Sequence, residues 1–300
     1  MTAPIKDSAG PSHAGPVSAT ESDQYPSVPE ECAIGDSDDD DEELVQMRRA
    51  GAQSRMQHQK SPEELRRAVI PFHWAPMLSP LIPADLPACV TLEHAALPDQ
   101  TQSCSAEQIE YCIRKCGGIC LGLFNTCPSS NINNWHIQTL PHARPVETSR
   151  QDQSKSVLFA HILATLGKHT LITDEDLQLP SNWRDAQTSS SHSSLGHQIS
   201  GRTICLHSFS VCPEVQGVGI GKSAMKAYVE LMNQSGVADR ISLICKQPLV
   251  SFFTKVGFKS AGKSKTTVVG SDWHNMSNIL TSSLSKTLEF PGSQTLASLD

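Results

Sequence analysis

Three glycines at alternate positions stand between a strand-like and a helix-like segment of this chain. Gly217, Gly219 and Gly221 follow the apolar segment 202–211 and precede a segment, 222–232, whose apolar residues recur at helical spacing. One helical face is formed by Met225, Tyr228, Val229 and Met232. Glycine adopts backbone angles closed to other residues and lets a ligand approach the main chain. A helix starting here would point free N–H groups and its positive dipole end at the loop. The junction therefore predicts a tight turn, a phosphate site, or both.

The spacing of the glycines excludes two common phosphate-binding loops. A dinucleotide fold needs the pattern G-x-G-x-x-G, whereas this chain has G-x-G-x-G. A P-loop ends in Gly-Lys-Ser, as residues 221–223 do, but it also needs a glycine where the chain has Gln216. From the glycines alone, a turn without a ligand stays open as the alternative.

The charge of the chain is distributed unevenly. The net charge is -7, and the stretch DSDDDDEE (36–43) alone carries seven acidic residues. Residues 202–265 instead carry nine Lys or Arg and three Asp or Glu. A basic segment around the glycines favours an anionic ligand there.

Composition and periodicity predict a tail followed by one mixed α/β domain. Residues 1–60 are rich in Ser, Pro, Gly and acids, and we expect them to be disordered. The acidic run would be a solvated tail, a site for a basic partner, or a phosphate acceptor at Ser37. The domain spans 74–290, with a polar insertion at about 125–155. Helices are expected at 61–69, with Ser61 as N-cap, and at 83–97, 105–116, 222–232 and 248–256; strands are expected at 118–124, 156–167, 202–211, 240–245 and 266–270.

The ten cysteines show no regular pairing, and the N-terminus has no apolar signal segment. We therefore expect reduced thiols and a cytoplasmic protein. Cys112, Cys116 and Cys120 lack the C-x-x-C spacing of zinc sites, so we expect core packing and no metal. No apolar run is long enough to cross a membrane. Neither a membrane nor a nucleic acid is expected as a partner.

The residues around the glycines resemble the acetyl-CoA-binding signature of the GNAT family of N-acetyltransferases. The signature runs V-x-P-x-x-Q-G-x-G-x-G from Val211 to Gly221. The segments LHSFSVCPEVQGVGIG, LICKQPLVSFFTKVGF, LIPADLPACVTLEHAAL and CGGICLGLF are similar to the arylalkylamine (serotonin) N-acetyltransferase branch. ITDEDLQLPSNW and GSDWHNM resemble its fungal members, including polyamine acetyltransferases. The resemblance covers residues 74–280, in the order of the family's elements.

This resemblance implies a fold and a co-substrate. The fold would be a mixed, mostly antiparallel sheet with splayed strands, flanked by helices. The co-substrate would be acetyl-CoA, with its pantetheine arm along Phe209, Ser210 and Val211. By similarity, the residues at the diphosphate would be Gln216, Gly217, Val218, Gly219, Ile220, Gly221 and Lys222.

The resemblance also implies direct attack of a free amine on the thioester, which requires a base to deprotonate the ammonium. His207 falls where the branch has a catalytic histidine, and strand alternation would place it on one face with Cys205, Phe209 and Val211. A second histidine of the branch is replaced here by Cys205. The tyrosine that protonates the leaving thiolate is replaced by Phe253, which would still lie at the cofactor but has no proton to donate. His274 is a weaker candidate for that role.

Three functions are compatible with these residues. The first is acetyl transfer to a small primary amine, either an arylalkylamine or a polyamine. The second is a weakly active or inactive acyl-CoA-binding protein, which Phe253 favours. The third is a protein or histone acetyltransferase whose acidic tail binds a basic partner. The resemblance favours the first.

Overall fold

The computed structural model describes part of the chain, all of it within the unit formed by residues 59–300. The described ranges are 61–97, 99, 103–128, 135–146, 153–185 and 193–281. The expected acidic tail, 1–60, lies outside them, as do residues 129–134 and 147–152 of the expected insertion. Within the described ranges, none of the helices has the length and apolarity that a bilayer crossing requires.

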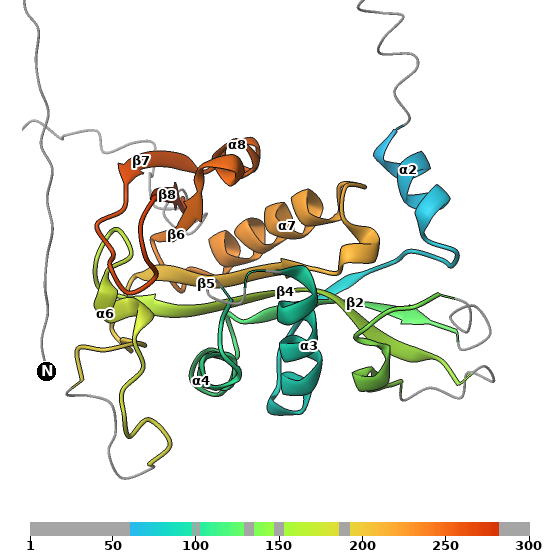
Figure 1. Cartoon of the computed structure of the whole chain (residues 1–300), viewed down its shortest axis with the longest axis horizontal. Coiled ribbons are helices and arrows are strands. Elements are labelled where there is room, and N and C mark those ends of the chain that lie inside the picture. Colours follow the sequence, from blue (N-terminus) through green and yellow to red (C-terminus); the bar gives the residue numbers. More distant parts are fainter. Residues whose placement is uncertain are drawn as a thin grey trace, which may run out of the picture. The chain divides into compact units, whose positions relative to one another are not determined.

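An eight-stranded sheet forms the centre of this unit (Figure 1). Its path runs β1-β2-β4-β5-β6-β8-β7, and β3 pairs with β4 beside this path. Every neighbouring pair is antiparallel except β5 with β6, which is parallel. The strands are β1 (Met77–Pro80), β2 (Leu121–Cys127), β3 (Arg144–Pro145), β4 (Lys155–Gly167), β5 (Thr203–Val211), β6 (Arg240–Lys246), β7 (Lys259–Lys263) and β8 (Trp273–Ile279). The expected mixed, mostly antiparallel sheet is confirmed.

Helices cover both faces of the sheet: α3 and α4 lie on one face and α7 and α8 on the other (Figure 1). The α-helices are α2 (Pro62–Val69), α3 (Leu86–Ala96), α4 (Ala106–Cys116), α6 (Asp174–Leu177), α7 (Ile220–Ser235) and α8 (Gln247–Lys255); the short 3-10 helices are η1 (Pro83–Asp85), η3 (Leu140–His142) and η5 (Pro213–Val215). On α7, Met225, Tyr228 and Met232 are buried and Val229 packs against them, as their spacing predicts. Burying this apolar face holds α7 against β5.

Local sequence signals set several helix starts. Ser61 accepts a hydrogen bond from the backbone N–H of Glu64, and the Glu64 carboxylate accepts one from the N–H of Ser61. This capping box starts α2 at Pro62, as the sequence predicts. Ser105 and Gln108 form the same arrangement at the start of α4.

The predicted strand at 266–270 is wrong. The segment is a turn between β7 and β8, and Gly270 has a φ of 80°. The backbone N–H groups of Thr267 and Val268 donate to the Asp174 carboxylate of α6. The Asp174 side chain, far away in sequence, therefore accepts hydrogen bonds from N–H groups that would otherwise pair with a neighbouring strand.

The cysteines of the described ranges are all free and buried. Cys112, Cys116 and Cys120 lie in the apolar core, and burial raises the pKa of each thiol, that of Cys120 to about 12. They pack as small apolar side chains. Within the same ranges, no group of three or more His, Cys, Asp and Glu is arranged to hold a metal ion.

Candidate functional site

The two edges of β5 differ in how far they are paired. β5 pairs with β4 from Thr203 to Val211. Along β6, the parallel register ends where Cys205 pairs with Ser242, although both strands continue beyond this point. Residues 206–211 of β5 and 243–246 of β6 therefore separate. We call this diverging part of the sheet the splayed segment; it is the splay that the sequence predicts.

The glycine loop, residues 216–221, connects β5 to α7 at the end of the splayed segment. Gly217 and Gly219 have φ angles of 77° and 85°, which other residues rarely adopt, and Gly219 is the N-cap of α7. The side-chain amide of Gln216 donates to the Val211 carbonyl at 2.9 Å. The loop is thus fastened to the last residue of β5.

Alternate residues of this loop point inward and outward. Val218 and Ile220 are buried and anchor the loop in the core. No atom lies within 4 Å of the place that a Cβ on Gly217 would occupy, so the main chain is open there. Lys222 is exposed in the first turn of α7. Unpaired N–H groups, the positive end of the helix and a lysine together form a surface suited to an anion.

His207 lies at a β-bulge. Leu163 pairs with Ser208 and the next residue, Ala164, pairs with Leu206, so His207 is an extra residue without a partner on β4. Its Nε2 lies 2.8 Å from Thr165 Oγ1, and the side chain is half-buried. Burial lowers the pKa of His207 to about 4. The ring is therefore neutral at pH 7, the state from which a general base must start, and it is a weaker base than an exposed imidazole.

The bulge also corrects the predicted face of β5. Strict alternation would place Cys205, Phe209 and Val211 on one face, but the extra residue reverses the alternation. Phe209 and Val211 face α7, because both lie within 4 Å of a Cβ built on Gly221. Cys205 pairs with Thr165 on the opposite face, where it is completely buried.

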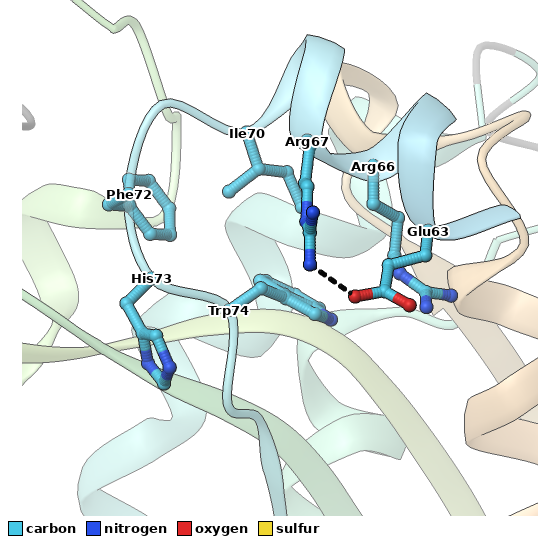
Figure 2. A pocket seen from close by; sticks show the side chains of 7 residues that line it. All are labelled: Glu63, Arg66, Arg67, Ile70, Phe72, His73 and Trp74. Atoms are coloured by element: carbon cyan, nitrogen blue, oxygen red, sulfur yellow. Dashed lines mark hydrogen bonds and ion pairs between the residues drawn. The ribbon is translucent and has the colours of Figure 1, made fainter.

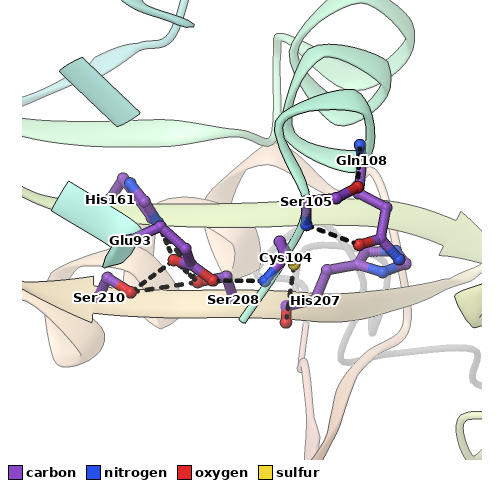
Figure 3. A network of polar contacts seen from close by, with 8 residues as sticks. All are labelled: Glu93, Cys104, Ser105, Gln108, His161, His207, Ser208 and Ser210. Carbon is purple, nitrogen blue, oxygen red and sulfur yellow. Dashed lines mark hydrogen bonds and ion pairs between the residues drawn. The ribbon is translucent and has the colours of Figure 1, made fainter. Parts of the chain in front are cut away.

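A buried polar network lies beneath the splayed segment (Figure 3). Ser208 and Ser210 of β5 donate to Glu93 Oε2 at 2.6 and 2.7 Å. His161 of β4 reaches the same oxygen through Nε2 at 2.9 Å. The backbone N–H of Cys104, just before α4, donates to Glu93 Oε1 at 2.8 Å. Glu93 thereby connects α3, β4, β5 and the start of α4.

The Glu93 carboxylate is ionised at neutral pH. Burial favours its neutral form, but hydrogen bonds from His161, Ser208 and Ser210 and the charge of His161 outweigh burial and lower its pKa below the ordinary 4.5. The sequence reasoning missed this residue. One signal was available: a glutamate among the apolar residues of α3, beside buried Cys89 and Leu92.

Aromatic side chains of α8 approach β5. Phe252 stacks on Phe209 with ring centroids 6.1 Å apart. Phe253 is buried and makes edge contacts with Phe252 and Phe258 at 5.1 and 5.6 Å. The residue in direct contact with β5 is thus Phe252, and Phe253 packs behind it.

His274 lies away from these groups. It is half-buried on β8, where it pairs with Cys245 of β6 and Lys263 of β7. The structure brings His207, Phe209, Ser210, Val211 and the glycine loop into one region, and it places His274 on a strand beyond β6.

Comparisons with known proteins agree with this arrangement. Residues 159–280 match the family model described as an acetyltransferase (GNAT) domain. No protein of curated function matches the chain.

Three similar solved structures share little sequence with the chain. The loading GNATL domain of CurA from Lyngbya majuscula is 13% identical with a TM-score of 0.45, covering 69% of this chain and 98% of that one. The GphF GNAT-like decarboxylase in complex with isobutyryl-CoA is 12% identical with a TM-score of 0.45, covering 68% and 100%. The ribosomal-protein-S18-alanine N-acetyltransferase from Escherichia coli is 14% identical with a TM-score of 0.38, covering 69% and 95%. The residues that match the acetyltransferase (GNAT) domain model, 159–280, include β5, the glycine loop and α7.

Proposed function

We propose that the protein is an N-acetyltransferase that moves the acetyl group of acetyl-CoA to a small primary amine, an arylalkylamine or a polyamine. One observation carries the proposal: β5 loses its partner β6 after Cys205 and leads into a glycine loop at the start of α7. An unpaired strand edge can hydrogen-bond the amides of pantetheine, and the loop can bind the diphosphate. The match of residues 159–280 to the acetyltransferase domain supports this assignment.

His207 is proposed as the base that deprotonates the amine. A neutral imidazole has one donor and one acceptor nitrogen. If Thr165 Oγ1 accepts a hydrogen bond from Nε2, then Nδ1 is the nitrogen with a free lone pair. Thr165 would then hold the tautomer that can take the proton, directly or through a water molecule.

The departing thiolate has no evident donor at Phe253, since a phenyl ring carries no acidic proton. This absence supports a second candidate, an acyl-CoA-binding protein with little or no turnover. The two candidates differ in one measurable property: only the first releases free CoA when an amine is added.

The test is an acetyl-transfer assay with tryptamine, phenethylamine and spermidine, following thiol release from acetyl-CoA. We expect turnover with at least one amine. His207→Ala should lower kcat about a hundredfold or more, the usual contribution of a general base, whereas His274→Ala should leave it unchanged. CoA binding without turnover on any amine would reject the enzyme and favour the second candidate. Equal activity of wild type and His207→Ala would reject His207 as the base.

A further inference from the structure

Helix α2 lies against the glycine loop, although it precedes the matched domain by a long stretch of chain. Pro62 Cβ is 3.7 Å from the place that a Cβ on Gly219 would occupy. One turn further on, Arg66 borders a hollow of about 140 Å³ that it shares with Ile220 and Ser223 of the first turn of α7. The other lining residues are apolar: Trp74, Pro76, Leu123, Ala224 and Ala227. The start of α2 and its Arg66 therefore border the surface proposed for the CoA phosphates.

The core anchors only the C-terminal end of α2, at its C-cap Ile70. The helix has no buried residue, and its apolar side chains Leu65 and Val69 are 37% and 39% exposed. Apolar burial holds most helices of a folded domain in place, and α2 gains little from it. Another interaction would stabilise its position beside the loop.

Two neighbouring arginines of α2 differ in their partners (Figure 2). Arg67 forms an ion pair with Glu63 at 2.7 Å, and both side chains are well exposed. Arg66 is half-buried, and its guanidinium forms no ion pair or hydrogen bond with any residue of the described ranges. In Figure 2 a dashed line joins Arg67 to Glu63, and none reaches the Arg66 guanidinium. Partial burial of an unpaired guanidinium is unfavourable, so this group is suited to an anionic ligand.

We infer that Arg66 binds a phosphate group of CoA and so fastens α2 over the glycine loop. The group is either the diphosphate or the 3′-phosphate, which offer the same ligand chemistry. A guanidinium binds phosphate oxygens through paired N–H donors, which an ammonium cannot do. This inference rests on the proposed CoA site and adds a residue from outside the matched domain to it.

The test compares Arg66→Gln with Arg67→Gln in the full-length chain by calorimetric titration with CoA. Both changes remove one charge from adjacent positions of α2, so Arg67→Gln is the matched control for net charge and helix propensity. We expect Arg66→Gln to weaken CoA binding about tenfold, in the range of a charge-assisted hydrogen bond. Arg67→Gln should stay within about twofold of wild type, as exposed ion pairs contribute little. Arg66→Lys should recover part of the affinity.

Dephospho-CoA, which lacks the 3′-phosphate, distinguishes the two phosphate sources. If Arg66 contacts the 3′-phosphate, Arg66→Gln and wild type bind dephospho-CoA equally. If it contacts the diphosphate, the tenfold difference persists. Equal CoA affinity of Arg66→Gln and Arg67→Gln would overturn the inference but leave the proposed function standing. A wild type that does not bind CoA would overturn both. Because α2 buries no residue, thermal unfolding without CoA should be the same for both variants.

Discussion

The two edges of β5 show how one strand can serve both stability and ligand binding. The edge toward β4 is paired from Thr203 to Val211 except at the His207 bulge, and it has the Glu93 network beneath it. The edge toward β6 is paired for three positions and then diverges, ending at a loop with an open main chain. The paired edge satisfies its polar groups within the protein. The splayed edge leaves main-chain groups free to bind a ligand. The paired edge keeps those groups in position.

The largest effect is expected on the paired edge. Glu93→Gln should lower the free energy of unfolding by about 3 kcal/mol, because it removes a buried charge that accepts from four donors and brings a donor among them. Urea denaturation measures this. The control is Glu107→Gln, which removes an exposed ion pair with Arg184 and should have no measurable effect. Equal stability of the two variants would show that the network does not hold the edge.

An intermediate effect is expected on the splayed edge. Gly217→Ala should weaken CoA binding about tenfold, because it introduces a side chain at the open main chain and strains a φ of 77° by about 1–2 kcal/mol. Gly262→Ala is the matched control. Gly262 has a similar φ of 86° and equal free space for a side chain, but it lies on β7. Titration calorimetry compares them. If both variants bind CoA like wild type, the loop is only a turn.

The effect that is smallest at pH 7 concerns the bulge on the paired edge, and it grows as the pH falls. His207 has a folded pKa of about 4 against an ordinary value of 6.5. As the pH falls from 6.5 toward 4, the unfolded chain binds a proton here that the folded chain does not, so stability decreases in this window. His207→Gln should make the loss of stability on acidification shallower, measured as thermal unfolding at pH 7, 6 and 5. The exposed His142→Gln should keep the wild-type slope.

The splayed edge was easier to predict than the paired one. Gly217, Gly219 and Gly221 are visible because glycine is chosen for backbone freedom, and the apolar face of α7 follows a simple period. The bulge at His207 leaves no such mark, because an extra residue in a strand changes register without changing composition. Strict alternation therefore assigned Cys205 to the face of Phe209.

Long-range contacts account for the other misses. Glu93 is buried because residues from β4 and β5 supply its donors, and no local pattern joins them. The 266–270 segment is rich in β-branched residues but forms a turn, because the Asp174 carboxylate accepts hydrogen bonds from its N–H groups. The helix at 62–69 was predicted from Ser61 and Glu64, but nothing in its sequence indicated that it would lie at the glycine loop.

Amide hydrogen exchange with and without saturating CoA measures whether the splayed edge of β5 and the glycine loop bind CoA while the paired edge holds them in place. We expect slower exchange in residues 216–222 and at the end of β5, with exchange in the centre of β4 unchanged. Saturating CoA that leaves exchange in residues 216–222 unaltered would contradict this expectation.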